Sequence, residues 1–201
     1  MSTESAPAST TIADPAPLGL LGFGFTTLLL SFANAGVVKI ADGAALVLSL
    51  AIFYGGGAQL VAGLWEFRRG NTLGSTAFFS YGAFWLTVWY WLHDEGGVAS
   101  SNVVAWFFLG WAIVTAIFTI ASLKTNHALI AVFFFLTVTF LFLAFGQWQA
   151  GGVFSPLNDP GLTKVGGYLG IVTGLLAWYT AAAVVINSSH QRELVPVNLK
   201  R

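Results

Sequence analysis

The stretch that decides the fold is ALIAVFFFLTVTFLFLAFGQW, residues 128–148. No charged side chain interrupts it, and its length matches the roughly 20 apolar residues that a helix needs to cross the hydrocarbon core of a membrane. Residues 131–136 do not alternate between apolar and polar types, as the strands of a membrane barrel do. The segment therefore predicts a membrane-spanning α-helix.

Five further segments have a similar length and composition, which predicts an all-α membrane protein with six transmembrane helices. The predicted spans are residues 18–38, 44–65, 73–92, 103–123, 128–148 and 165–186. Short loops rich in Gly, Asn, Asp and Pro join them, so residues 14–187 form one transmembrane domain. We expect residues 1–13, rich in Ser, Thr, Ala and Pro, to be a disordered cytoplasmic tail. Residues 188–201 are expected to form a second cytoplasmic tail.

The composition excludes several classes of function. With 56% hydrophobic and 8% charged residues, the chain has too few charges to cover the surface of a soluble domain. Its 8 Lys and Arg balance its 8 Asp and Glu, so no nucleic-acid partner is expected. The predicted spans hold no pair of carboxylates, no Cys and no Ser–His pair. We therefore expect no enzyme, no metal site and no cofactor.

The distribution of Lys and Arg predicts the orientation in the membrane. All charged residues lie outside the predicted spans, and most basic ones share one side: Arg68, Arg69, Lys124, Arg192, Lys200 and Arg201. The other side has only Lys39 and Lys164. Because cytoplasmic loops are enriched in Lys and Arg, both termini should be cytoplasmic in a multi-pass protein of the cell (inner) membrane.

Four polar side chains inside the first two spans are candidates for the lining of a pathway: Thr26, Thr27, Asn34 and Gln59. An amide that faced lipid would leave its donors and acceptor unpaired, so Asn34 and Gln59 need partners. Those partners are either other helices or a pore and its substrate. With no ionisable group deep in a predicted span, a path must be lined by hydroxyls, amides, backbone groups and aromatic rings.

Glycines mark two further positions. The three consecutive glycines at 55–57 lie inside the second span, and they indicate either the close approach of another helix or a local break that lines a cavity. Gly166, Gly170 and Gly174 recur every four residues in the sixth span, which is typical of a helix-packing face.

The first span begins with the motif Asp14-Pro15-Ala16-Pro17-Leu18-Gly19-Leu20. Proline suits the first turn of a helix, because the N–H that it lacks has no partner there. Asp14 is placed to accept a hydrogen bond as the N-cap residue. The motif therefore predicts a capped helix start, whose free N–H groups can attract an anion.

Further blocks follow this motif: Gly22-Phe23-Gly24, Phe53-Tyr54-Gly55-Gly56 with Gln59, Gly70-Asn71-Thr72, Ser80-Tyr81-Gly82 and Leu136-Thr137-Val138. In order and spacing they resemble the acetate uptake transporter family (AceTr), which includes the bacterial succinate–acetate permeases of the YaaH type. The resemblance covers about residues 14 to 187. The family motif usually begins with Asn, where this chain has Asp14. An added negative charge at a pore mouth is expected to weaken the approach of an anion.

The resemblance implies six helices around a narrow central pathway in each protomer, assembly into a homo-hexamer, and uptake of acetate. Succinate and small monocarboxylates other than acetate are the further substrates that the resemblance implies. It also implies a hydrophobic constriction formed by Phe23, Tyr81 and Leu136. We expect Phe23 and Leu136 to contact the methyl group of acetate, and the Tyr81 hydroxyl to donate to an oxygen. A linked proton would travel with the substrate itself.

Two other functions remain open from the sequence. A passive channel for a small neutral solute, such as ammonia or water, would need a similar apolar path, and saturable flux that acetate competes for would separate the two. A membrane partner or sensor that transports nothing would use the glycine faces for assembly.

Overall fold

The computed structural model describes residues 12–39, 44–93, 98–154 and 161–198. Its helices are α1 (Ala16–Asn34), α2 (Ala44–Leu50), the π-helix η2 (Ala51–Ala58), α3 (Gln59–Arg69), α4 (Thr72–His93), α5 (Ser101–Ser122), α6 (His127–Ala150) and α7 (Gly161–His190). Because α2, η2 and α3 follow one another without a break, these helices make six rods. Within the described ranges the only strand-like pairing is an isolated bridge between Ser100 and Val153. The predicted disordered tail, residues 1–13, lies outside the described residues except for its last two positions.

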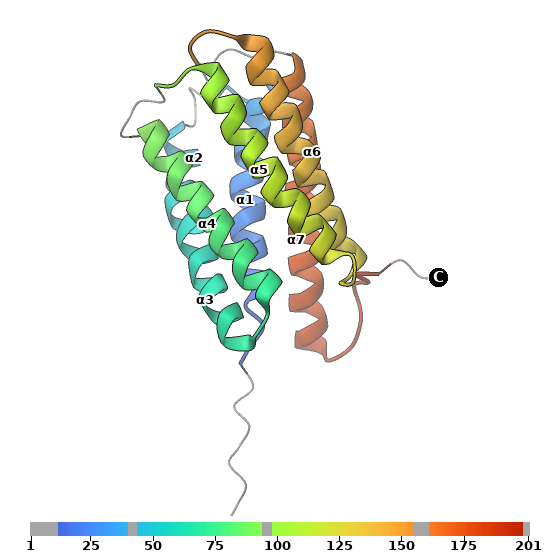
Figure 1. Ribbon diagram of the computed structural model, residues 1–201. Helices are drawn as coiled ribbons and strands as arrows, with labels where there is room; N and C mark the ends of the chain where they lie inside the picture. Colours follow the sequence, from blue (N-terminus) through green and yellow to red (C-terminus); the bar gives the residue numbers. More distant parts are fainter. Residues whose placement is uncertain (1–11, 40–43, 94–97, 155–160, 199–201) are drawn as a thin grey trace, which may run out of the picture.

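The six rods surround a common axis (Figure 1). α1 packs along α7, α7 along α6, and α6 along α5, while α4 packs on α3 and η2, which return to α1 and close the ring. The backbones of α4 and α5 approach each other least within this ring. Long side chains bridge that seam, as where the ring of Phe84 stacks on the ring of Phe107 with 5.8 Å between their centroids.

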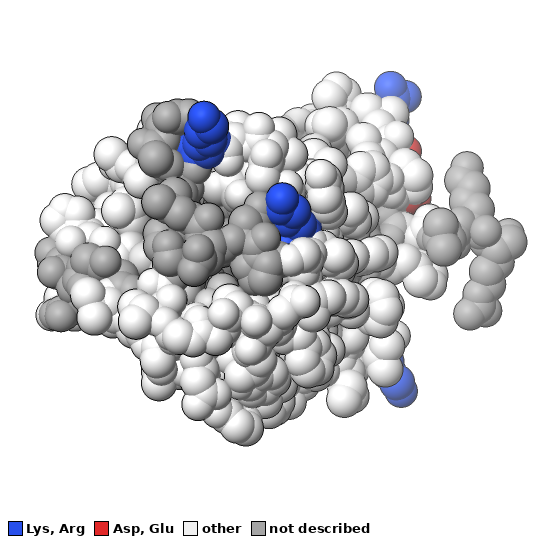
Figure 2. Space-filling model, turned by 90° about the horizontal axis from the view of Figure 1, so that it is seen from above, with Lys and Arg blue, Asp and Glu red and all other residues white. Residues whose placement is uncertain are grey.

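The first and the last helix share one end of the bundle. α1 begins there and α7 ends there, beside the α3–α4 and α5–α6 loops (Figure 1); we call this the terminal end and the opposite one the distal end. The loops at the terminal end carry Lys124 and the basic pair that ends α3, Arg68 and Arg69. Seen from the distal end, the described surface shows few charged side chains (Figure 2).

Length and hydropathy separate α4 from the other rods. Among the described residues, five rods are long and apolar enough to cross a membrane, and α4 is not one of them. It has 22 residues, but the Trp, Tyr, Ser and Thr side chains along it lower its hydropathy. Its place in the ring, packed on α3 and η2, makes it the sixth rod of the bundle.

Two predicted spans end elsewhere than expected. α1 ends at Asn34, four residues before the predicted end, and the chain turns at Gly36 with a φ of 73°. The second rod runs on to Arg69 and is ended by Gly70, whose φ is 76°. Glu66, Arg68 and Arg69 are therefore part of a helix in a candidate membrane span, and the prediction that every charged residue lies outside the spans is wrong at these three residues.

The last helix extends beyond its predicted span at both ends. α7 runs to His190, past the predicted end of the transmembrane domain at residue 187. Residues 191–198 then fold back, because the side-chain oxygen of Asn187 accepts from the N–H groups of Leu194 at 2.7 Å and Val195 at 2.9 Å. The Ala128 N–H donates to the Val197 carbonyl at 3.1 Å, which ties this segment to the first turn of α6.

The glycines at 55–57 lie in η2, and they allow neighbouring helices to approach closely. A Cβ atom added at Gly55 would lie 2.8 Å from the Thr26 Oγ1 of α1 and 2.8 Å from the Trp85 Cγ of α4. At Gly57 the nearest contact would be the Ile52 carbonyl oxygen at 3.5 Å, an ordinary distance. Of the two explanations for these glycines, the structure therefore gives close approach, and only at part of the run.

We expect Gly55→Ala to destabilise the protein by about 1–3 kcal/mol, because an extra methyl group overpacks the contact between α1, η2 and α4. Gly57→Ala is the matched control in the same helix, and it should leave stability unchanged or raised. Thermal unfolding of the purified protein in detergent measures both variants. Equal melting temperatures would show that the contact at Gly55 is not tight.

Candidate functional site

Two cavities lie along the axis of the bundle, one toward each end. The terminal cavity, of about 440 Å³, is lined by residues at the start of α1, the end of α3 and the start of α6, among them Asp14, Arg69 and Asn126. The distal cavity, of about 90 Å³, reaches the end of α1 at Asn34 and the end of α6 at Gln147. Together they follow the length of the ring from one end to the other.

Three residues are common to the linings of the two cavities. Phe23, Tyr81 and Leu136 line both of them, and they come from α1, α4 and α6. All three are buried, with 5%, 3% and 2% of their surface exposed. The rings of Phe23 and Tyr81 lie 5.5 Å apart between centroids. These are the three residues expected from the family resemblance, and the structure brings them together between the cavities.

Tyr81 is held on several sides. Its hydroxyl donates to the Thr115 Oγ1 of α5 at 2.9 Å, and its ring packs against Phe118 and Phe133. The hydrogen of the Tyr81 hydroxyl is therefore used in the bond to Thr115 on α5. The phenolic oxygen can still accept a hydrogen bond from a donor in the pathway. The sequence did not single out Thr115, because a Thr in an apolar helix is usually satisfied by its own backbone.

The four predicted polar residues take different places. Gln59 lines the terminal cavity, and Thr27 and Asn34 line the distal cavity. Thr26 lines neither of these two cavities: its hydroxyl donates to the Gly22 carbonyl at 2.9 Å within α1. Its position is therefore one of helix packing, against η2.

The motif at the start of α1 forms part of the mouth of the terminal cavity. Asp14, Ala16 and Leu20 line this cavity. The N-cap position belongs to Pro15 rather than to Asp14, but the Asp14 Oδ1 accepts from the Ala16 N–H at 3.0 Å. The same oxygen accepts from the Arg69 Nη1 at 2.6 Å. The negative charge of Asp14, which was expected to repel an anion, is thus paired with the guanidinium of Arg69.

Glu66 is a site residue that the sequence analysis missed. Its side chain is fully buried, lines the terminal cavity, and neither carboxylate oxygen has a hydrogen-bond partner among the described residues. The Arg69 Nη1 lies 3.9 Å from its Oε2. Glu66 follows Gln59 by seven residues, a spacing that places both on one face of a helix. The seven-residue spacing could have identified Glu66 from the sequence. It was missed because the second span was predicted to end at residue 65, one residue before Glu66.

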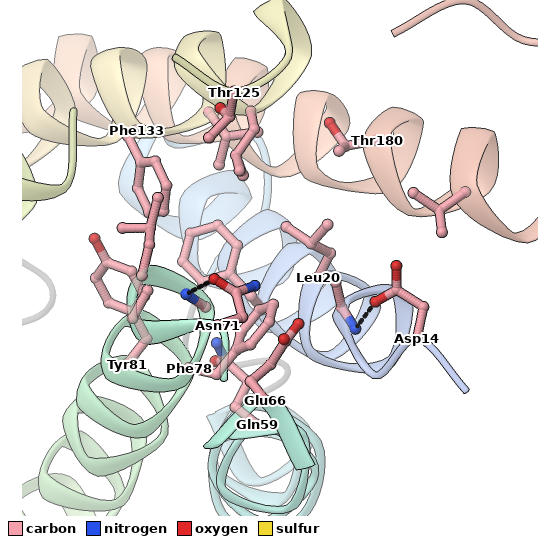
Figure 3. A pocket seen from close by; sticks show the side chains of 18 of the residues that line it. Asp14, Leu20, Gln59, Glu66, Asn71, Phe78, Tyr81, Thr125, Phe133 and Thr180 are labelled. Atoms are coloured by element: carbon pink, nitrogen blue, oxygen red, sulfur yellow. Dashed lines mark hydrogen bonds between the residues drawn. The ribbon is translucent and has the colours of Figure 1, made fainter. Parts of the chain in front are cut away.

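Figure 3 shows how these side chains meet. Gln59 and Glu66 extend from α3 toward the side chains of α1 and α4, with Phe78, Tyr81 and Phe133 around them. Asn71 sits at the start of α4, where its side-chain oxygen accepts from the Gly74 N–H at 3.1 Å. The described residues contain no group of three His, Cys, Asp or Glu side chains that could hold a metal ion. The site is thus a mouth with three charged side chains that narrows to an apolar neck.

Comparison with known proteins gives relatives over nearly the whole chain. The GPR1/FUN34/yaaH family matches residues 1–199. The succinate-acetate/proton symporter SatP of Escherichia coli (strain K12) is 39% identical over 193 residues, which cover 94% of this chain and 97% of that protein. Ammonia transport outward protein 2 of Saccharomyces cerevisiae is 38% identical over 180 residues, which cover 85% of this chain and 61% of the yeast protein.

A solved structure agrees with these relatives. The structure of the bacterial acetate channel SatP matches with a TM-score of 0.85 and 37% sequence identity, and the match covers 94% of this chain and 100% of that one. The family expected from the sequence motifs is thereby confirmed, together with the all-α membrane fold. The chain belongs to the GPR1/FUN34/yaaH family.

Proposed function

We propose that this protein carries acetate across the membrane through the terminal cavity, the constriction and the distal cavity. We also propose that it accepts small monocarboxylates other than acetate, and the dicarboxylate succinate. The observation that carries the proposal is the constriction, where Phe23, Tyr81 and Leu136 line both cavities. The names of the bacterial relative and of the matching structure support acetate as the substrate.

The chemistry of the neck suits a small acid with one apolar end. An apolar constriction resists hydrated ions, since it offers no groups to replace their water. The side chains of Phe23 and Leu136 are apolar surfaces for a methyl group, and the phenolic oxygen of Tyr81 faces the same neck from α4. An acid that carries its own proton meets the lowest barrier here, and this supports a linked movement of substrate and proton.

We further propose the setting in which this transport occurs. The protein is a multi-pass protein of the inner membrane with both termini in the cytoplasm, and the excess of Lys and Arg at the terminal end supports this orientation. It acts as a homo-hexamer, as the family resemblance implies. It works without a cofactor and without enzymatic chemistry.

A second candidate function is passage of a small neutral solute. The yeast relative is named for outward transport of ammonia, and an apolar neck also admits a neutral molecule of that size. A flux of ammonia that acetate does not inhibit, in protein that takes up no labelled acetate, would favour this alternative.

We expect labelled acetate to enter liposomes that contain the purified protein in a saturable manner, with competition by propionate and succinate. Tyr81→Ala removes one wall of the constriction and its hydrogen bond to Thr115, so it should change KM and the ranking of competitors. Tyr168→Ala is the control, because Tyr168 lies on α7 with 57% of its surface exposed and should leave uptake unchanged. Uptake no greater than in empty liposomes would contradict the proposal.

The negative charge of Asp14 at the mouth of the terminal cavity should affect the KM for acetate. Asp14→Asn removes one negative charge and releases Arg69, so we expect the KM for acetate to fall a few-fold at low ionic strength. In about 1 M salt the difference should vanish, since the Debye length is then about 3 Å. Glu193→Gln, which removes an exposed charge outside both cavities, is the control. A rise in KM in Asp14→Asn would contradict this expectation.

A further inference from the structure

The Gln59 amide is buried and unpaired beside the pathway. None of its side chain is exposed, and neither its nitrogen nor its oxygen has a hydrogen-bond partner among the described residues. An amide left in this state costs about 1–3 kcal/mol. Because Gln59 lines the terminal cavity, a molecule in that cavity is the candidate partner for this amide.

The backbone places this amide deep in the cavity, near the constriction. Gln59 is the first residue of α3, directly after η2, and it lies seven residues, or about 10 Å along a helix, from Glu66 at the mouth. Its neighbour Leu60 lies against Gly82, where an added Cβ would be 3.0 Å from the Leu60 side chain. Gln59 is therefore level with the part of α4 that carries Tyr81.

An amide distinguishes the two forms of a carboxylic acid. It presents one acceptor and one donor side by side, and a protonated acid presents the matching donor and acceptor, so two hydrogen bonds form at once. An ionised carboxylate offers acceptors only, which leaves the amide oxygen unpaired against a negative charge. We propose that Gln59 binds the substrate as the protonated acid, and so selects the form that enters the constriction.

This inference rests on the proposed function and adds to it the residue that selects the protonated form. The ionisable side chains that line the same cavity are Asp14 before α1, Glu66 and Arg69 on α3, and Tyr81 on α4. The side chains of α6 and α7 that line this cavity are not ionisable. The selection is assigned to Gln59 because its amide has no charge of its own to be paired by Arg69, whereas both carboxylates at the mouth lie near that guanidinium.

The test uses two neutral competitors of acetate uptake by the full-length protein in liposomes. Acetamide offers a donor and an acceptor on one carbon, as acetic acid does, whereas methyl acetate offers acceptors only. We expect acetamide to compete with labelled acetate at least about tenfold better than methyl acetate, the value of one or two hydrogen bonds. This arm needs no variant, so it does not depend on the folding of a mutant.

Two substitutions then locate the effect. Gln59→Met keeps the length of the side chain and removes both polar groups, and it should raise the KM for acetic acid about tenfold and abolish the preference for acetamide. Glu66→Gln removes the buried carboxylate and keeps Gln59, so the preference for acetamide should persist. Its persistence would show that titration of Glu66 is not the source of the selection.

The outcomes separate this inference from the proposed function. Saturable acetate uptake with equal competition by acetamide and methyl acetate would overturn the role of Gln59 and leave acetate transport intact. The same holds if folded Gln59→Met keeps the wild-type KM and the acetamide preference. Absence of acetate uptake in the folded wild type would overturn both.

Discussion

Inside a membrane every polar group must be satisfied by the protein itself, and the rest of this structure depends on that constraint. The backbone satisfies this constraint by remaining helical through six rods. This includes residues 51–58, where the hydrogen-bond pattern changes to that of the wider π-helix. Most hydroxyls in the rods meet it locally. Thr139 and Thr173 each donate to a carbonyl four residues earlier in their own helix, at 2.8 and 2.9 Å. Among the buried polar groups of the described residues that have no partner, the amide of Gln59 and the carboxylate of Glu66 both belong to residues that line the terminal cavity.

The charges of the site are concentrated at one mouth. Arg69 lies against Asp14 and near Glu66, so one guanidinium serves two carboxylates. Beyond this cluster the pathway presents uncharged groups as far as the distal cavity. Under the proposed function, a carboxylate that approaches from the terminal end would leave an environment with a cation for one without, which would favour a neutral form of the same molecule.

How much of this could be predicted from the sequence depended on the kind of signal. Hydropathy located the rods, since a run such as residues 128–148 has no other stable setting. The constriction came from the resemblance, because no local property of Phe23, Tyr81 or Leu136 reveals that they meet. Hydropathy failed at the end of α3, where a helix continues for a turn beyond its apolar run and buries a carboxylate. The π-helix and the Tyr81–Thr115 bond are products of tertiary packing, which a one-dimensional pattern does not contain.

The segment after α7 has a consequence for the start of α6. The first turn of α6 is capped in part by residues at the far end of the chain, because the N–H groups of His127 and Ala128 donate to Asn198 and Val197. If residues 197 and 198 were detached from α6, these two N–H groups would have only water or lipid headgroups as partners. The start of α6 is therefore held by a segment that follows α7, so a change near residue 197 acts on a helix that begins some seventy positions earlier in the sequence.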